Sequence, residues 1–203
     1  QAGETVLDAC AAPGGKTAHI LERIAAAGEG ELKELVALDL KPERLQRIDD
    51  NLARLNFTAS TVVADATDSG WRKSGSLFDR ILIDAPCSGS GVIRRNPDIK
   101  LRQTPESIEE AKRGQEAILV SAAKLLKPGG RLVYATCSFL PEENQEIIEN
   151  FLAAHTKFTL LNCAELFMQQ KIPLDTGMFL QLYPDEHNTD SFFAAALMLA
   201  RND

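Results

Sequence analysis

Short apolar runs rich in β-branched residues alternate with longer helical patterns along almost the whole chain. Strands that alternate with helices pair in parallel and are covered by helices on both faces, so this alternation predicts an α/β fold. We expect a doubly wound, mostly parallel sheet of seven strands. The expected strands are residues 5–10, 34–40, 60–66, 78–86, 131–138, 157–162 and 191–200, and the expected helices are 16–27, 41–56, 104–127 and 141–155.

Proline and glycine mark several ends of these segments. Pro42 and Pro105 stand where the first turns of two helices would begin, and the KPGG sequence at 127–130 predicts the end of the long helix. The segment 162–191 has no clear pattern, so we predict no element there. Because 203 residues without repeats or linkers fit one core, we expect a single domain over residues 1–203. Since a strand begins almost at once, we also expect a C-terminal fragment of a longer chain.

The composition excludes several classes of protein. The cysteines at positions 10, 87, 137 and 163 have neither the spacing of a disulfide framework nor that of a zinc site. No apolar run approaches the ~20 residues of a membrane span, and no signal-peptide pattern is present. We therefore expect a soluble cytoplasmic protein with no membrane contact, no metal and no obligate protein partner. The net charge of −7 restricts any nucleic-acid contact to a local cluster, formed by Arg94, Arg95, Lys100 and Arg102.

Thiols and carboxylates stand at the carboxyl ends of successive predicted strands. In an open sheet of this kind the ligand binds at that edge, near the point where the strand order switches. We therefore expect a single crevice at that edge. Cys163 has no such partner and is expected to be a packing residue. The crevice would contain Cys10, Asp39, Asp65, Asp84, Cys87 and Cys137.

The sequence DACAAPGGKT joins the first strand to the first helix. Its glycines let the backbone approach a ligand, and the helix N-terminus favours negative charge. A phosphate-binding NTPase loop would need glycine at Cys10, and the dinucleotide fingerprint G-x-G-x-x-G is absent from the sequence. A ligand with a carboxylate, a ribose and an adenine fits better, and S-adenosylmethionine is such a ligand. Asp39 would then accept both ribose hydroxyls, and Asp65 would accept from the adenine amino group.

Asp84, Cys87 and Cys137 supply the groups that methylation of a pyrimidine at C5 requires. A cysteine thiolate adds to C6, which allows C5 to attack the methyl group of a sulfonium. The reaction also needs a carboxyl group at the N3 edge and a base for the C5 proton. Spacing alone does not identify which of the two thiols attacks.

The motifs resemble, in the same order, those of the RNA cytosine-5 methyltransferases of the Fmu/Sun type, over nearly the whole chain. GVIRRNPDIK in particular is similar to the bacterial enzyme that acts on small-subunit ribosomal RNA. The resemblance implies S-adenosylmethionine-dependent methylation of C5 of a cytosine, with 16S ribosomal RNA as the expected substrate, through a covalent cysteine adduct. The motifs are DACAAPGGKT, LDL, VVADAT, DRILIDAPCSGSGVIRRNPDIK, LKPGGRLVYATCSFLPEEN and DSFFAAALML.

The resemblance also implies a role for each site residue. Cys137, in the TCS motif, would be the nucleophile, and Cys87, in the PC motif, would assist proton removal and product release. Asp84 would contact the cofactor and the N3 edge of the base, and Lys16 would reach into the active site. Part of the RNA affinity would lie in the family's separate N-terminal domain. The implied cofactor contacts are Cys10, Ala11, Ala12, Pro13, Gly14, Gly15, Lys16, Asp39, Asp65 and Asp84.

Three other functions fit the sequence less well. A zinc nucleobase deaminase would need a second cysteine at Ser90 and an H-x-E motif, which the sequence lacks. A non-catalytic RNA-binding or ribosome-assembly module would be expected to lose the catalytic residues, yet both thiols, Asp84 and Lys16 are present. A DNA cytosine-5 methyltransferase would use the PC thiol and carry a target-recognition insert, whereas this chain has the TCS thiol and no such insert.

Overall fold

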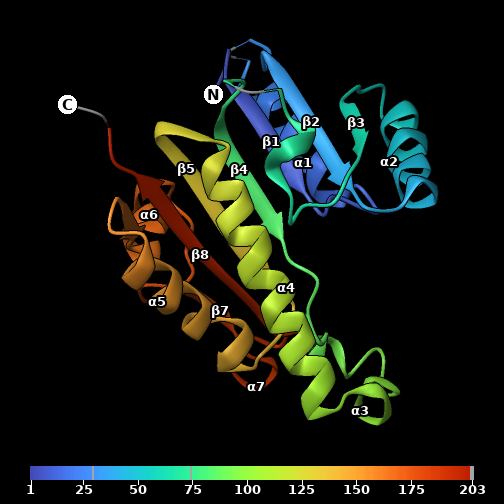
Figure 1. Ribbon diagram of the computed structural model, residues 1–203, viewed down its shortest axis with the longest axis vertical. Coiled ribbons are helices and arrows are strands. Elements are labelled where there is room, and N and C mark those ends of the chain that lie inside the picture. Colours follow the sequence, from blue (N-terminus) through green and yellow to red (C-terminus); the bar gives the residue numbers. More distant parts are fainter. Residues whose placement is uncertain (29, 74, 202–203) are drawn as a thin grey trace.

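The computed structural model describes residues 1–28, 30–73 and 75–201. Its strands form one eight-stranded sheet, in which seven strands follow the order β3-β2-β1-β4-β5-β8-β6 and β7 pairs with β8 (Figure 1). The expected mostly parallel sheet of the methyltransferase type is confirmed, with one additional strand. The strands are β1 (Thr5–Ala9), β2 (Glu34–Asp39), β3 (Ser60–Val63), β4 (Phe78–Asp84), β5 (Leu126–Thr136), β6 (Phe158–Leu161), β7 (Leu180–Leu182) and β8 (Phe192–Leu199).

The chain reverses its direction across the sheet between β1 and β4. From β1 the chain adds β2 and then β3 on one side, and it returns to add β4 and then β5 on the other, with all of these pairs parallel. β8 then pairs antiparallel with β5 and β6. Because the switch in strand order lies between β1 and β4, their carboxyl ends border the crevice in which a ligand of such a sheet binds.

Helices cover both faces of the sheet. α4 and α5 lie side by side across the near face in Figure 1, whereas α1 packs with α2. Successive side chains of β2 point to opposite faces of the sheet and so belong to two different cores. Val36 and Leu38 pack in the core on the side of α4, whereas Ala37 packs with Ile48 of α2 on the other side. The helices are α1 (Gly15–Ala27), α2 (Pro42–Arg54), α3 (Ile99–Arg102), α4 (Pro105–Lys124), α5 (Gln145–Ala154), α6 (Cys163–Gln169) and α7 (Pro184–His187), with 3-10 turns η1 (Ser69–Trp71), η2 (Ser90–Val92) and η3 (Pro141–Glu143).

The boundary between α4 and β5 differs from the sequence prediction. The helix ends at Lys124, and β5 already begins at Leu126 and runs through the KPGG sequence. Gly129 has a φ of +78°, and a Cβ at Gly130 would lie 2.8 Å from the carbonyl oxygen of Lys127. The pairing with β4 shifts its register here, so the glycines form an irregularity within the strand and do not end the helix.

The segment 162–191, for which no element was predicted, contains α6, β7 and α7. β7 adds to the sheet through antiparallel pairing, with Leu180 opposite Ala194 and Leu182 opposite Phe192. These elements have seven, three and four residues, which is too short to show a clear periodic pattern and explains why the sequence did not reveal them.

Candidate active site

The two cysteines that follow β4 and β5 face each other across the carboxyl edge of the sheet. The sulfur atoms of Cys87 and Cys137 lie 3.4 Å apart, and both side chains are half-buried. The hydrogen bond from Cys87 lowers the pKa of Cys137, although burial opposes this. The same hydrogen bond and burial raise the pKa of Cys87. Cys137 is therefore the thiol of the pair that ionises more readily, and Cys87 is the one that keeps its proton more strongly.

An ion pair from the glycine loop and β4 lies beside the thiols. Lys16 Nζ donates to Asp84 Oδ2 at 2.6 Å, and the ammonium also lies 5.5 Å from the ring centroid of Phe192. The charge of Asp84 raises the pKa of Cys137, and the charge of Lys16 lowers it. The structure thus brings together the four residues expected to carry the chemistry, Lys16, Asp84, Cys87 and Cys137.

Asp8 is a buried carboxyl group that the sequence analysis missed. Its side chain is fully buried in β1, and its Oδ2 accepts a hydrogen bond from the Thr17 hydroxyl at 2.6 Å. Its Oδ1 has no partner among the described residues. Burial raises the pKa of Asp8 to about 6, while the Thr17 hydrogen bond opposes this rise. The sequence analysis treated this segment as a buried strand and gave Asp8 no role. A charged residue within an apolar run was the signal that could have identified Asp8.

The loop between β1 and α1 is held by side chains from α2. Arg44 donates to the carbonyl oxygen of Ala12 at 3.1 Å, and Asn51 donates to that of Pro13 at 3.0 Å. Gly14 has a φ of +99°, and a Cβ there would lie 3.1 Å from Ile48 Cα, so only glycine fits without strain. No side chain in the described part of the chain caps α1, which leaves its first amide groups available to an anionic ligand.

The two aspartates expected to contact the cofactor differ in exposure. Asp39 is 2% exposed, and its Oδ2 accepts from the backbone N–H of Ala12 at 3.2 Å, so in this structure it fixes the glycine loop. Its contact with a ribose stays a prediction. Asp65 is exposed beyond β3, and its Oδ1 accepts from both the backbone and the hydroxyl of Thr67 at 2.8 Å.

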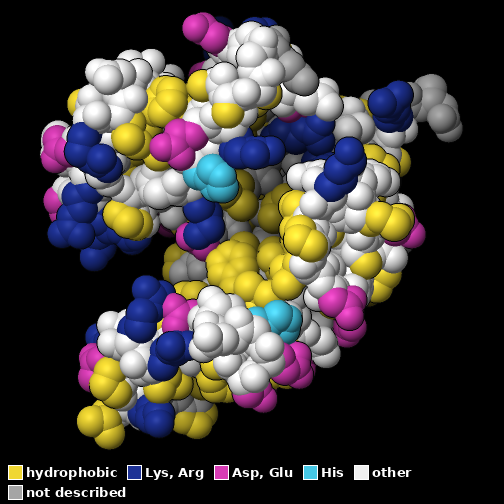
Figure 2. Space-filling view, turned by 180° about the vertical axis from the view of Figure 1, so that it is seen from behind, with side chains coloured by type: hydrophobic (Ala, Val, Ile, Leu, Met, Phe, Trp, Pro, Cys, Tyr) yellow, Lys and Arg dark blue, Asp and Glu magenta, His cyan; other side chains and the backbone are white. Residues whose placement is uncertain are grey.

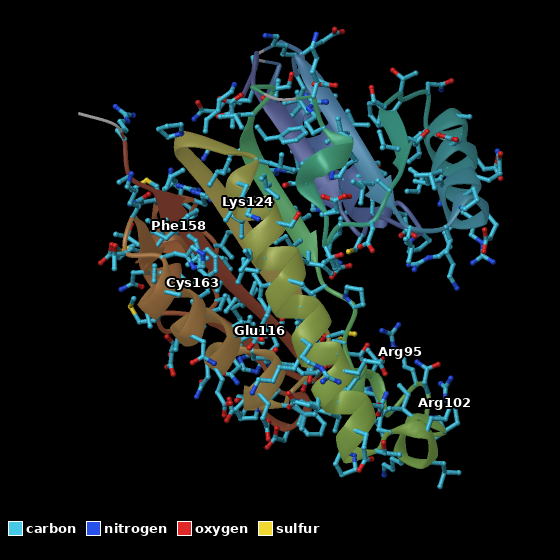
Figure 3. The ribbon with its side chains drawn as sticks, in the orientation of Figure 1. Arg95, Arg102, Glu116, Lys124, Phe158 and Cys163 are labelled. Atoms are coloured by element: carbon cyan, nitrogen blue, oxygen red, sulfur yellow. The ribbon has the colours of Figure 1, made fainter. Side chains whose placement is uncertain are left out.

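The other two cysteines have different surroundings. Burial raises the pKa of Cys10 to about 12, and the charge of Asp39 adds to this rise, so Cys10 is a poor nucleophile. Cys163 begins α6, and Figure 3 shows it on the other side of α4 from Arg95. Burial raises the pKa of Cys163 as well.

The predicted basic cluster lies on the segment around α3. Figure 3 shows Arg95 and Arg102 together on this outer segment. Arg95 pairs with Asp190, and Arg102 pairs with Asp98 at 2.8 Å on the same short helix. Both arginine side chains are about two-thirds exposed, so a phosphate can compete for them.

A groove lies against β1, β4 and β5, beside α1. It has a volume of about 690 Å³, with Val6, Leu82 and Val133 among its apolar residues and Arg80 and Arg131 beside them. Figure 2 shows this hollowed face, with apolar side chains inside it and Lys and Arg side chains around it. No three His, Cys, Asp or Glu side chains of the described residues group as metal ligands, and none of the described helices is long and apolar enough to cross a membrane.

The strand order and the solved neighbours define the class of the protein. Its fold is that of the Rossmann-like methyltransferases. The structure of NSun6 from Pyrococcus horikoshii with SFG superposes with a TM-score of 0.81 at 31% identity, and the match covers 98% of this chain and 48% of that chain.

The chain belongs to the family described as 16S rRNA methyltransferase RsmB/F, whose family model matches residues 1–198. It is 46% identical to the ribosomal RNA small subunit methyltransferase B of Shewanella oneidensis, with 98% of this chain and 44% of that protein covered. Its identity to the protein of the same name from Vibrio vulnificus is 45%, with 97% and 42% covered. The chain thus spans less than half the length of the curated relatives it matches.

Proposed function

We propose that this chain forms the catalytic part of an RNA methyltransferase that transfers a methyl group from S-adenosylmethionine to C5 of a cytosine in 16S ribosomal RNA. The observation that carries this proposal is the pair of thiols 3.4 Å apart beside the Lys16–Asp84 ion pair, at the carboxyl edge of a methyltransferase sheet. Membership of the RsmB/F family supports ribosomal RNA as the substrate.

The residues at the carboxyl edge fit the proposed cofactor. The uncapped N-terminus of α1 suits a carboxylate, and the exposed Asp65 can accept from an amino group. Leu40 and Val63, which follow Asp39 and end β3, are 60% and 56% exposed, and their apolar surface suits a purine ring. S-adenosylmethionine, when bound, supplies an electrophilic methyl group on a sulfonium.

The nucleophilic step follows from the asymmetry of the thiols. The thiolate of Cys137 would form a bond to C6 of the cytosine, and the electron pair of the C5–C6 double bond would become available at C5 for the methyl group that the sulfonium supplies, the electron pair of the broken methyl–sulfur bond staying on sulfur. Asp84 would face the N3 edge of the base, and Lys16 would hold the Asp84 carboxylate in place through the 2.6 Å contact. A base in folded RNA must be flipped out to reach this crevice.

Release of the product requires a proton to move. When Cys137 becomes a thioether, Cys87 loses the partner that contributes most to its raised pKa, so its proton can pass to water more easily than in the free pair, although burial and Glu143 still oppose this. The Cys87 thiolate then takes the proton from C5, the C5–C6 double bond forms again, and the bond between C6 and Cys137 breaks. Cys137 leaves as a thiolate, and Cys87 ends the cycle as a thiol.

The proposal is tested by measuring the transfer of labelled methyl groups to unmodified small-subunit ribosomal RNA. The assay uses the full-length protein. Cys137→Ala should abolish transfer and keep cofactor binding. Cys87→Ser should accumulate a protein–RNA adduct that survives denaturation, because it forms the bond to C6 but releases the product slowly. Label at a position other than C5 of cytosine, or full activity of Cys137→Ala, would refute the mechanism. Cofactor binding without any transfer would favour a non-catalytic RNA-binding module.

A further inference from the structure

A buried carboxylate holds the loop that carries Cys87. Glu143 lies in η3, between β5 and α5, and is fully buried. Its Oε1 accepts from the backbone N–H of Ser88 at 2.8 Å, and its Oε2 accepts from the Ser88 hydroxyl at 2.5 Å. Both carboxylate oxygens therefore bind the residue that directly follows Cys87.

Gln115 of α4 holds the other side of Cys87. It is fully buried, and its Nε2 donates to the carbonyl oxygen of Pro86 at 2.9 Å and to Glu143 Oε1 at 3.0 Å. Pro86 and Ser88, the neighbours of Cys87 in the chain, are thus fixed by one connected pair of side chains. This restricts the movement of Cys87.

The two thiol-bearing loops are also joined to each other. The backbone N–H of Gly91 donates to the carbonyl oxygen of Cys137 at 2.9 Å, and the hydroxyls of Ser90 and Ser138 lie 2.9 Å apart. Ser90 and Ser138 are both buried. The distance between the two sulfur atoms is therefore set by buried contacts on both loops.

The charge of Glu143 acts on the two thiols unequally. Each donor that the structure gives to Glu143 is a neutral group, and among the described residues no cation forms an ion pair with this buried carboxylate, so its field is not cancelled by a direct partner. After the hydrogen bond with Cys137 and burial, the charge of Glu143 adds to the raised pKa of Cys87. At Cys137 the neighbouring charges are those of Asp84 and Lys16.

We propose that Glu143 is a positioning residue that decides which thiol is the nucleophile, because both of its carboxylate oxygens hold the residue after Cys87 and its buried negative charge lies on the same loop contact. This inference rests on the proposed function, since it assigns the attacking role to Cys137. It explains why two cysteines in equivalent positions, at the ends of neighbouring strands, would have different chemical roles.

The test is the pH dependence of Cys87 alkylation by iodoacetamide in the folded chain, followed by mass spectrometry. The Cys137→Ser background removes the thiol partner and isolates the effect of Glu143. In this background Glu143→Gln should lower the midpoint of the Cys87 pH profile by about one unit, with alkylation about tenfold faster near neutral pH. Glu143→Asp keeps the charge and should retain the high midpoint.

Glu142→Gln is the matched control, because Glu142 is the exposed neighbour and should leave the midpoint unchanged. A looser loop would change the plateau rate but not the midpoint, which separates charge from access. An unchanged midpoint in Glu143→Gln overturns the proposal. If that variant does not fold, the order in which the two thiols of the wild-type chain are alkylated provides the test. Alkylation of Cys87 before Cys137 between about pH 6 and about pH 9 would also overturn the proposal.

Neither alkylation readout uses RNA or cofactor. Absence of methyl transfer would therefore refute the proposed function and leave the thiol measurements valid. An unchanged midpoint together with normal methyl transfer would refute only the role of Glu143.

Discussion

Alanine in place of Gly14 should destabilise the chain by about 2–4 kcal/mol. Gly14 has a φ of +99°, and an L-residue in the left-handed region is strained by about 1–2 kcal/mol. The added Cβ would lie 3.1 Å from Ile48 Cα and 3.2 Å from Cγ1 and Cγ2 of the same residue. Ile48 is fully buried and its backbone belongs to α2, so it cannot move away, and the crowding adds about 1–2 kcal/mol.

Variants of two other glycines, at the two ends of α1, allow backbone strain to be measured separately from crowding by neighbouring atoms. Gly28, which ends the helix, has a φ of +64°, and a Cβ there would meet nothing within 4 Å, so Gly28→Ala should lose only about 1 kcal/mol. Gly15 has no positive φ and also has open space around it. Gly15→Ala should therefore be neutral or should stabilise the chain by about 0.5 kcal/mol.

Urea unfolding followed through the fluorescence of Trp71, the single tryptophan, measures all three variants. The expected order of stability is Gly15→Ala, then Gly28→Ala, then Gly14→Ala. A loss for Gly14→Ala no larger than that for Gly28→Ala would refute the reasoning about Ile48. Titration with S-adenosylmethionine adds a second readout, because reduced affinity in the stable Gly15→Ala variant would show that the ligand needs the space beside Gly15.

Two further predictions concern a carboxylate and the thiol pair. Burial would raise the pKa of Asp79, but hydrogen bonds from Lys127 and Thr5 lower it to about 2, so its contribution to stability is present above about pH 4 and is lost as the pH falls towards 2. Asp79→Asn should lower the free energy of unfolding by about 1 kcal/mol near neutral pH, after a discount for partial exposure. If the stability of this variant fell as steeply with falling pH as that of the wild type, the prediction would be contradicted. Hydrogen peroxide should oxidise Cys87 and Cys137 to a disulfide, with two protons and two electrons passing to the peroxide, because the sulfur atoms need to close only from 3.4 Å to about 2.05 Å. Intact mass should fall by about 2 Da, whereas addition of oxygen without this loss would show that the loops are too rigid to close.

The sequence predicted the sheet because its information is local and periodic. Apolar runs such as those of β1 and β4 are buried along much of their length, and Pro42 and Pro105 begin their helices as expected. The resemblance to the RNA methyltransferases is confirmed by the family match. The extent of β5 could not be predicted, because the KPGG sequence suits either a helix end or an irregular strand, and pairing with β4 decides between them.

The sequence could predict that the thiols and Asp84 lie together, but not the contacts that each of them makes. Because parallel strands end at one edge, the sequence could place Asp84, Cys87 and Cys137 near one another. It could not show that Asp39 turns towards Ala12, since this depends on the path of the glycine loop. Glu143 was also missed, because a glutamate before a helix is typical of an exposed first turn, and only the fold shows that Ser88 and Gln115 surround it.

The asymmetry of the thiols is a property of the fold around them and not of the cysteines themselves. A free pair at 3.4 Å would share a proton with no preference for either sulfur, so the preference must come from the burial of each thiol and from the groups around it. The hydrogen bond between the thiols and burial contribute most to the two pKa shifts. Lys16 of α1 adds by lowering the pKa of Cys137, and Glu143, from the segment before α5, adds by raising that of Cys87. These two charges are far apart in the chain, so the selection of the nucleophile depends on the folding of both halves of the sheet. A peptide that carried the two thiol motifs alone should therefore show no preference between them.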